Sequence, residues 1–241
     1  MRKILAFILP VIIITSSCRM MGGKRVEGNG NIKTEERSVG AFSRVEVHGS
    51  IDVYVTQGEL KPVRIEGDEN LLEYIEVKQD GNKIEVRNRK GYNLDPSTDM
   101  KIYVTSPVFN DIDVSGACDI IGETKISNDD KIRLHVSGAG DIRMEVDVPR
   151  VTADITGSGS VNLKGKTRDF SCDLSGAGKA RCFDLLAENA KIDISGAGNA
   201  EVYASIKLDA QVSGAGSVSY KGNATTVNQK VSGAGSVHKV E

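Results

Sequence analysis

Apolar and polar residues alternate with a period of two along most of the chain, and the alternation is organised around a repeated phrase. The phrase reads Val/Ile-Ser-Gly-Ala-Gly in most copies and occurs seven times. Its copies begin at Val114, Val136, Ile155, Leu174, Ile194, Val212 and Val231. Successive Ser or Thr positions are separated by 22, 19, 19, 20, 18 and 19 residues, a period typical of solenoid repeats.

Each repeat predicts two short strands joined at a Gly-containing corner. Apolar residues precede the Ser or Thr by one, three and five positions, and alternation resumes five and seven positions after it. A helix is disfavoured because each interior Gly would cost about 1 kcal/mol. Equivalent strands stacked about 4.8 Å apart would bury the apolar columns between coils. We therefore predict an all-β fold, a single-stranded parallel β-helix with repeats of about 19 residues, right-handed by the general crossover rule.

The first residues predict an exported lipoprotein. Met1-Arg2-Lys3 precedes an apolar run over 4–14, which is too short to span a bilayer, so residues 1–17 are interpreted as a signal peptide. Small residues directly before Cys18 resemble the bacterial lipobox, although Thr15 stands where Leu is commonest. Acylation of Cys18 would anchor the mature protein to a membrane, and the alternative is an ordinary secreted protein.

The remaining chain divides into three segments. Residues 18–36 contain Gly22-Gly23 and Gly28-Asn29-Gly30, which predict a flexible tether after the acylated Cys, with order starting near Arg37. Residues 37–106 predict a β-rich part with irregular coils, and residues 107–241 the regular repeats.

Two local features of the N-terminal part refine this picture. The segment 47–53 resembles a decayed copy of the phrase, so the solenoid is expected to begin there with larger insertions. A helical turn is expected around 68–73, with Asp68 as its cap.

These residues together resemble a known family. The lipoprotein-like leader, the segment Phe42–Val53, the motif Asp68-Glu69-Asn70-Leu71-Leu72 and the iterated Ser-Gly-Ala-Gly are similar to the bacterial putative auto-transporter adhesin family with a head GIN domain, frequent in Bacteroidetes. The resemblance covers roughly residues 37–240. It implies a β-helix-like fold and an extracytoplasmic location, and it supplies no catalytic residues.

Charge and cysteine content narrow the chemistry. Removing Arg2 and Lys3 with the leader leaves 29 basic and 33 acidic residues, a net charge of −4, which gives no reason to expect a nucleic-acid partner. Cys172 and Cys182 fall on inward columns, where they would act as small apolar side chains or form a disulfide across one corner. Neither they nor Cys118 form a zinc pattern, and no cofactor is expected.

Two groups of residues are candidates for a ligand surface. Asp154, Asp173 and Asp193 occupy one outward column, which predicts a Ca²⁺ site or an acidic wall facing a glycan, or alternatively a solvated face relieved by Lys and Arg. Tyr74 and Tyr92 lie where the chain is richest in Tyr, so they could serve as sugar platforms or simply as half-buried strand aromatics.

The leading functional hypothesis is a non-enzymatic, lipid-anchored adhesin or binding module, most simply at the outer membrane, with its periplasmic or surface face left open. Its partners would be the membrane, through the lipid, and a surface glycan or protein. A β-helix enzyme acting on polysaccharide, as a lyase or hydrolase, is the alternative by fold analogy, and a structural or assembly protein is the third. The last coil exposes strand edges, which predicts a homo-oligomer through the C-terminal coil.

Overall fold

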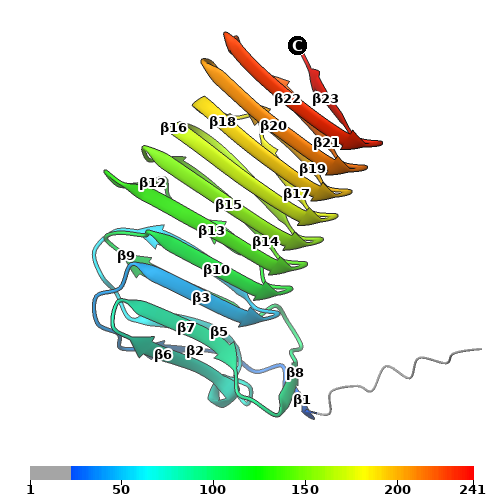
Figure 1. The fold of residues 1–241 in the computed structure, drawn as a ribbon. Helices are drawn as coiled ribbons and strands as arrows, with labels where there is room; N and C mark the ends of the chain where they lie inside the picture. Colours follow the sequence, from blue (N-terminus) through cyan, green and yellow to red (C-terminus); the bar gives the residue numbers. More distant parts are fainter. Residues whose placement is uncertain (1–22) are drawn as a thin grey trace, which may run out of the picture.

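The computed structural model describes residues 23–241, so Cys18 and the predicted leader lie outside the described residues. The first part contains nine strands and one short 3₁₀ helix (Figure 1). They are β1 (Lys24–Glu27), β2 (Ile32–Arg37), β3 (Arg44–Gly49), β4 (Asp52–Gln57), β5 (Val63–Asp68), η1 (Leu72–Tyr74), β6 (Ile75–Asp80), β7 (Lys83–Asn88), β8 (Tyr92–Asp95) and β9 (Lys101–Ser106). Among the described residues no helix is long and apolar enough to cross a bilayer.

The second part is a continuous stack of parallel strands (Figure 1). These are β10 (Asp111–Gly116), β11 (Ile120–Gly122), β12 (Ile126–Ser127), β13 (Lys131–Gly138), β14 (Asp141–Asp147), β15 (Arg150–Gly157), β16 (Ser160–Gly176), β17 (Lys179–Cys182), β18 (Leu185–Gly196), β19 (Asn199–Tyr203), β20 (Lys207–Gly214), β21 (Ser217–Lys221), β22 (Thr226–Gly233) and β23 (Ser236–Lys239). The predicted all-β parallel solenoid is confirmed.

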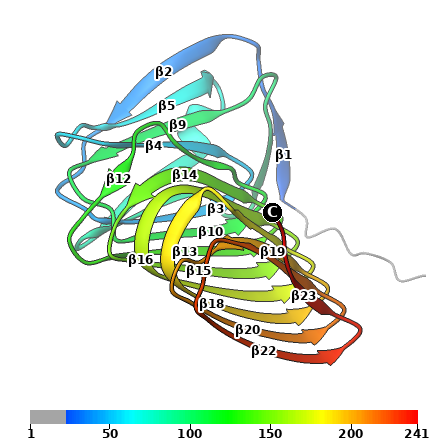
Figure 2. The same ribbon diagram turned by 90° about the horizontal axis from the view of Figure 1, so that it is seen from above.

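Equivalent positions of successive repeats lie in register. Strand β15 pairs with β16 so that Ile155 lies opposite Leu174, and β16 pairs with β18 so that Leu174 lies opposite Ile194. All three side chains are buried in the shared interior. The view from above shows β13, β15, β18, β20 and β22 along one wall (Figure 2), and the C-terminal part of β16 is paired between β15 and β18. Full burial of each such Leu or Ile stabilises the stack by about 2 kcal/mol.

The corner of each repeat brings two backbones too close for a side chain. At Gly157 φ is +114°, and a Cβ there would lie 2.5 Å from the Gly138 carbonyl oxygen. The second glycine is as constrained, since a Cβ on Gly159 would lie 2.3 Å from the Gly140 oxygen. This approach lets the Ser158 amide donate to the Gly138 carbonyl at 2.8 Å. Glycine is therefore required by the stacking as well as by the turn.

The solenoid begins in the N-terminal part, as the sequence predicts. Strand β3 lies beneath β10, with Val47 opposite Val114 and Gly49 opposite Gly116. Strand β4 lies beneath β11 in the same way. The insertion between β4 and β9 then folds back, because β7 pairs with β3 in parallel while β6 pairs with β7 antiparallel. A β-hairpin therefore covers the first coil.

The flexible tether predicted for residues 18–36 is wrong for the described part of that segment. Strand β1 pairs with β8, and β2 pairs antiparallel with β5. The glycines there serve packing: a Cβ on Gly28 would lie 2.3 Å from the Asp68 carboxylate, and Gly30 takes a φ of +75°. Glycine permits the close approach and the positive φ that bring this segment against the fold.

Asp68 forms hydrogen bonds that hold this N-terminal segment against the fold, and it does not cap a helix. Its fully buried carboxylate accepts hydrogen bonds from the Gly30 amide at 2.7 Å, from the Ser97 amide at 2.8 Å and from the Ser97 hydroxyl at 2.6 Å. Burial acts to raise the pKa of Asp68, but these hydrogen bonds outweigh it and leave the pKa lowered. The 3₁₀ helix starts after Leu71, with no side-chain cap, so the predicted capping role is wrong.

The corner geometry predicts a large effect of one added methyl group. Gly157→Ala should destabilise the protein by about 2 kcal/mol or more, because the methyl group meets a backbone oxygen and the backbone stays at positive φ. Gly58→Ala is the matched control, since the nearest atom to its Cβ is a Thr105 methyl at 3.7 Å and its φ is ordinary. Urea unfolding followed by circular dichroism measures both. Equal midpoints for the two variants would contradict the proposed corner constraint.

Candidate ligand-binding surfaces

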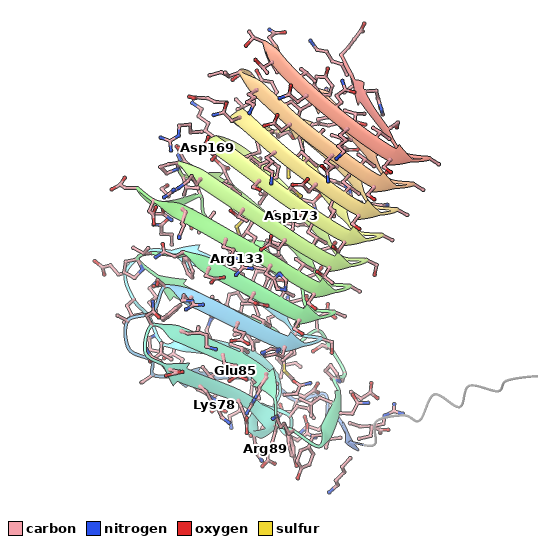
Figure 3. The ribbon with its side chains drawn as sticks, viewed as in Figure 1. Lys78, Glu85, Arg89, Arg133, Asp169 and Asp173 are labelled. Carbon is pink, nitrogen blue, oxygen red and sulfur yellow. The ribbon has the colours of Figure 1, made fainter. Side chains whose placement is uncertain are left out.

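An outward row of polar side chains runs along one wall of the solenoid. Its members stand two positions before the repeated Ser or Thr and lie in register: Asp113, His135, Asp154, Asp173, Asp193, Gln211 and Lys230. The structure thus brings the three predicted aspartates together, with Asp173 between Asp154 and Asp193. Figure 3 shows Asp173 on this wall. We call this surface the charged wall.

Two of the three aspartates form ion pairs with cationic side chains. Arg133 contacts the Asp154 carboxylate at 2.8 Å, and Lys191 contacts the Asp193 carboxylate at 2.9 Å. Asp173 forms no ion pair within residues 23–241, and burial together with the charges of Asp193 and Asp154 raises its pKa. The same residues contain no group of three His, Cys, Asp or Glu side chains placed to hold a metal ion. The arrangement therefore fits a solvent-exposed face whose charges are balanced by Lys and Arg better than it fits a cation site.

The charged wall is hollowed beside this row. A shallow cavity of about 460 Å³ is bordered by side chains that include Arg150, Asp169, Asn189, Lys191 and Asp209. The Asn189 amide donates to the Asp169 carboxylate at 2.9 Å. Hydrogen-bond donors, hydrogen-bond acceptors and charges of both signs therefore line the cavity. Such a lining suits a polar, hydroxyl-bearing ligand better than an apolar one.

The two predicted tyrosines contact each other. The ring centroids of Tyr74 and Tyr92 are 4.5 Å apart with an interplanar angle of 43°, and the Arg89 guanidinium lies 5.4 Å from the Tyr74 ring. Burial and the neighbouring Glu73 raise the pKa of Tyr74. Figure 3 places Arg89 at the N-terminal end of the stack, away from Asp173. The tyrosines and the aspartates therefore do not form one surface.

A second aromatic group was missed by sequence reasoning. The Tyr54 and Tyr103 rings, from β4 and β9, stack at 4.9 Å, and the Arg64 guanidinium from β5 lies 3.8 Å from the Tyr103 ring. A cavity of about 470 Å³ borders Arg64 and Tyr103. Each tyrosine stands between two buried apolar residues, which is a signal for an outward position. Their pairing needs the register of β4 with β9, which the sequence does not reveal.

The three cysteines of the solenoid are free and buried. Burial raises the pKa of Cys182 to about 12 and raises that of Cys172 well above its ordinary value. Cys118 likewise has a raised pKa, again through burial. The conceivable disulfide between Cys172 and Cys182 is absent, and both thiols fill the interior as small apolar groups.

Comparisons with known proteins fit this architecture. The sequence profile of the family described as putative auto-transporter adhesin, head GIN domain, matches residues 41–224, and the chain belongs to this family. The match extends from the first coil well into the regular repeats. The resemblance inferred from the motifs is thereby confirmed.

Several solved structures share the fold. A putative adhesin from Bacteroides fragilis is 23% identical with a TM-score of 0.85, covering 89% of this chain and 100% of that chain. A putative lipid binding protein from Parabacteroides distasonis is 23% identical, with a TM-score of 0.71 and coverage of 90% and 100%. A putative adhesin from Parabacteroides merdae is 24% identical, with a TM-score of 0.69 and coverage of 91% and 100%. A search of curated proteins finds no match.

The unpaired charge of Asp173 predicts a pH-dependent gain of stability. Because its folded pKa is raised, its penalty is absent below the ordinary value of 3.8 and fully present above the raised value. Because Asp173 is exposed and solvent screens its charge, Asp173→Asn should stabilise the protein near pH 7 by only about a few tenths of a kcal/mol, and not near pH 3.

Asp209→Asn is the control with the opposite sign. Lys207 and Asn228 lower the pKa of Asp209, so its contribution is present above the ordinary value of 3.8 and is lost as pH falls. The variant should be slightly destabilised near pH 7. Urea unfolding at both pH values measures the pair, and a loss of stability in Asp173→Asn at neutral pH would refute the interpretation.

Proposed function

We propose that the protein is a non-enzymatic binding module of the adhesin type, held in the cell envelope by a lipid on Cys18. The observation that carries this proposal is the register of the charged wall. Polar side chains repeat there at a spacing of about 4.8 Å on a stack fixed by its backbone. Such a rigid row can contact an extended partner at several successive coils at little cost in ordering itself.

The proposed ligand is a surface glycan or a protein with extended polar structure. Membership in a family described as putative auto-transporter adhesin supports a binding role, and the mixed donors and acceptors around Asn189 and Lys191 support a polar ligand. Tyr74 and Tyr92 remain a candidate contact for sugar, and Asp154, Asp173 and Asp193 a candidate acidic wall. Location at the outer membrane belongs to the same proposal.

Two experiments test the anchor and the binding role separately. Mass spectrometry of the membrane-extracted protein should show acyl chains on Cys18, and Cys18→Ser should release the protein from the membrane fraction. The purified mature domain should bind a subset of a glycan array or immobilised surface protein. Binding should fall in Lys191→Ala and persist in Lys179→Ala, whose exposed side chain belongs to another strand of the coil.

The enzyme alternative is tested on the same sample. A reducing-end assay on the glycans that bind would show product if the solenoid were a hydrolase or lyase. Binding without product supports the adhesin proposal, and product formation overturns its non-enzymatic part. Neither binding nor product would favour the third hypothesis, a structural protein.

We also propose self-association through the last coil. Strands β22 and β23 are paired on one side only within the described residues, and Val231 is 43% exposed. Open strand edges favour pairing with another chain. Light scattering over a concentration series should show a dimer that Val231→Lys weakens, whereas Leu60→Lys, at an exposed Leu of the N-terminal part, should not. A monomer at every concentration contradicts this proposal.

A further inference from the structure

The chain between Cys18 and the fold is short. Strand β1 is paired over its whole length with β8, and the Lys24 amide donates to the Gly91 carbonyl at 2.7 Å. Five residues, 19–23, separate Cys18 from Lys24, and the six Cα–Cα steps between these two residues span at most about 20 Å when fully extended. A tether of the predicted length would have reached about three times as far. An acyl group on Cys18 would therefore hold the start of β1 within about 20 Å of the membrane surface.

Aromatic and basic side chains gather where the chain leaves the fold. Tyr92 lies directly opposite Lys24 in the β1–β8 pair, and its ring contacts Tyr74. Lys90 and Lys24 are exposed, and within the described residues neither forms an ion pair with a carboxylate. Arg89 lies over the Tyr74 ring. Figure 1 shows β1 and β8 at the end of the stack opposite to β22 and β23.

These residue types suit a bilayer surface. Tyrosine, with an apolar ring and a polar hydroxyl, is enriched at the level of lipid headgroups. Exposed lysines near a membrane are attracted to anionic headgroups. Both kinds of side chain are held here by a rigid strand pair within reach of an anchored cysteine.

We infer that this chain-exit surface, formed by Lys24, Tyr74, Arg89, Lys90 and Tyr92, rests on the lipid headgroups around the anchor. The inference depends on the proposed acylation of Cys18, and it makes membrane contact the alternative to the sugar contact proposed above for Tyr74 and Tyr92. The solenoid then points away from the bilayer. Seven strand spacings separate β3 from β22, about 34 Å, so the last coil stands clear of the membrane.

Site-specific fluorescence tests this orientation on the full acylated protein. Lys90→Cys and Lys230→Cys place one exposed thiol at each end of the stack, whereas Cys118, Cys172 and Cys182 are buried. The protein without an added cysteine gives the background labelling. Each labelled variant is reconstituted into phosphatidylethanolamine and phosphatidylglycerol vesicles that carry a headgroup quencher. Position 90 should be quenched several-fold more strongly than position 230.

Two further variants test whether the chain-exit surface touches the lipid headgroups or only lies near them. Lys24→Glu, an exposed change that leaves the backbone bond to Gly91 in place, should reduce quenching at position 90. Tyr74→Ser with Tyr92→Ser should do the same, whereas Tyr54→Ser with Tyr103→Ser, the matched pair on β4 and β9, should not. Circular dichroism confirms that each variant is folded.

Each outcome decides a different point. Equal quenching at both positions, with Cys18 acylated, overturns the orientation. The contact surface is overturned if quenching at position 90 is reduced neither by Lys24→Glu nor by the double substitution of Tyr74 and Tyr92. An unacylated Cys18 in the mass spectrum overturns the proposed anchor instead, and with it the basis of this inference.

Discussion

The whole stack depends on the close approach of backbones at the glycine corners. Each corner carbonyl accepts an amide from the next coil, as the Gly157 carbonyl does from Ala177 at 2.8 Å, and no Cβ fits between them. This contact fixes the vertical register, because a shift of one residue would put a side chain where none can fit. The apolar columns are buried only while that register holds.

A fixed register constrains the inside of the solenoid and leaves the outside free. Inward positions carry apolar side chains of different sizes, among them Val, Ile, Leu, Ala and Cys. Outward positions carry acids, bases and amides in rows, and like charges in one row are relieved by cations from the neighbouring row, as Arg133 relieves Asp154. Binding specificity can therefore be encoded on the walls without disturbing the core.

The N-terminal part covers the first coil of the stack and packs the first strands of the chain against it. The β6–β7 hairpin covers the first coil, and Asp68 accepts hydrogen bonds from Gly30, between β1 and β2, and from Ser97, which follows β8. These contacts make residues 24–37 part of the fold. Under the proposed acylation of Cys18, the position of β1 rather than the length of the predicted tether would set how the solenoid stands on a membrane.

The sequence by itself determined the strand pattern, the repeat, the in-register column of Asp154, Asp173 and Asp193, and the first coil at 47–53, because period-two alternation and corner glycines are local signals. Only the tertiary structure decided that Gly28 and Gly30 are packed rather than flexible, and that Asp68 binds Ser97 instead of capping η1. It also decided that Tyr54 stacks on Tyr103. Those outcomes depend on contacts between segments far apart in the chain, whose pairing no local pattern specifies.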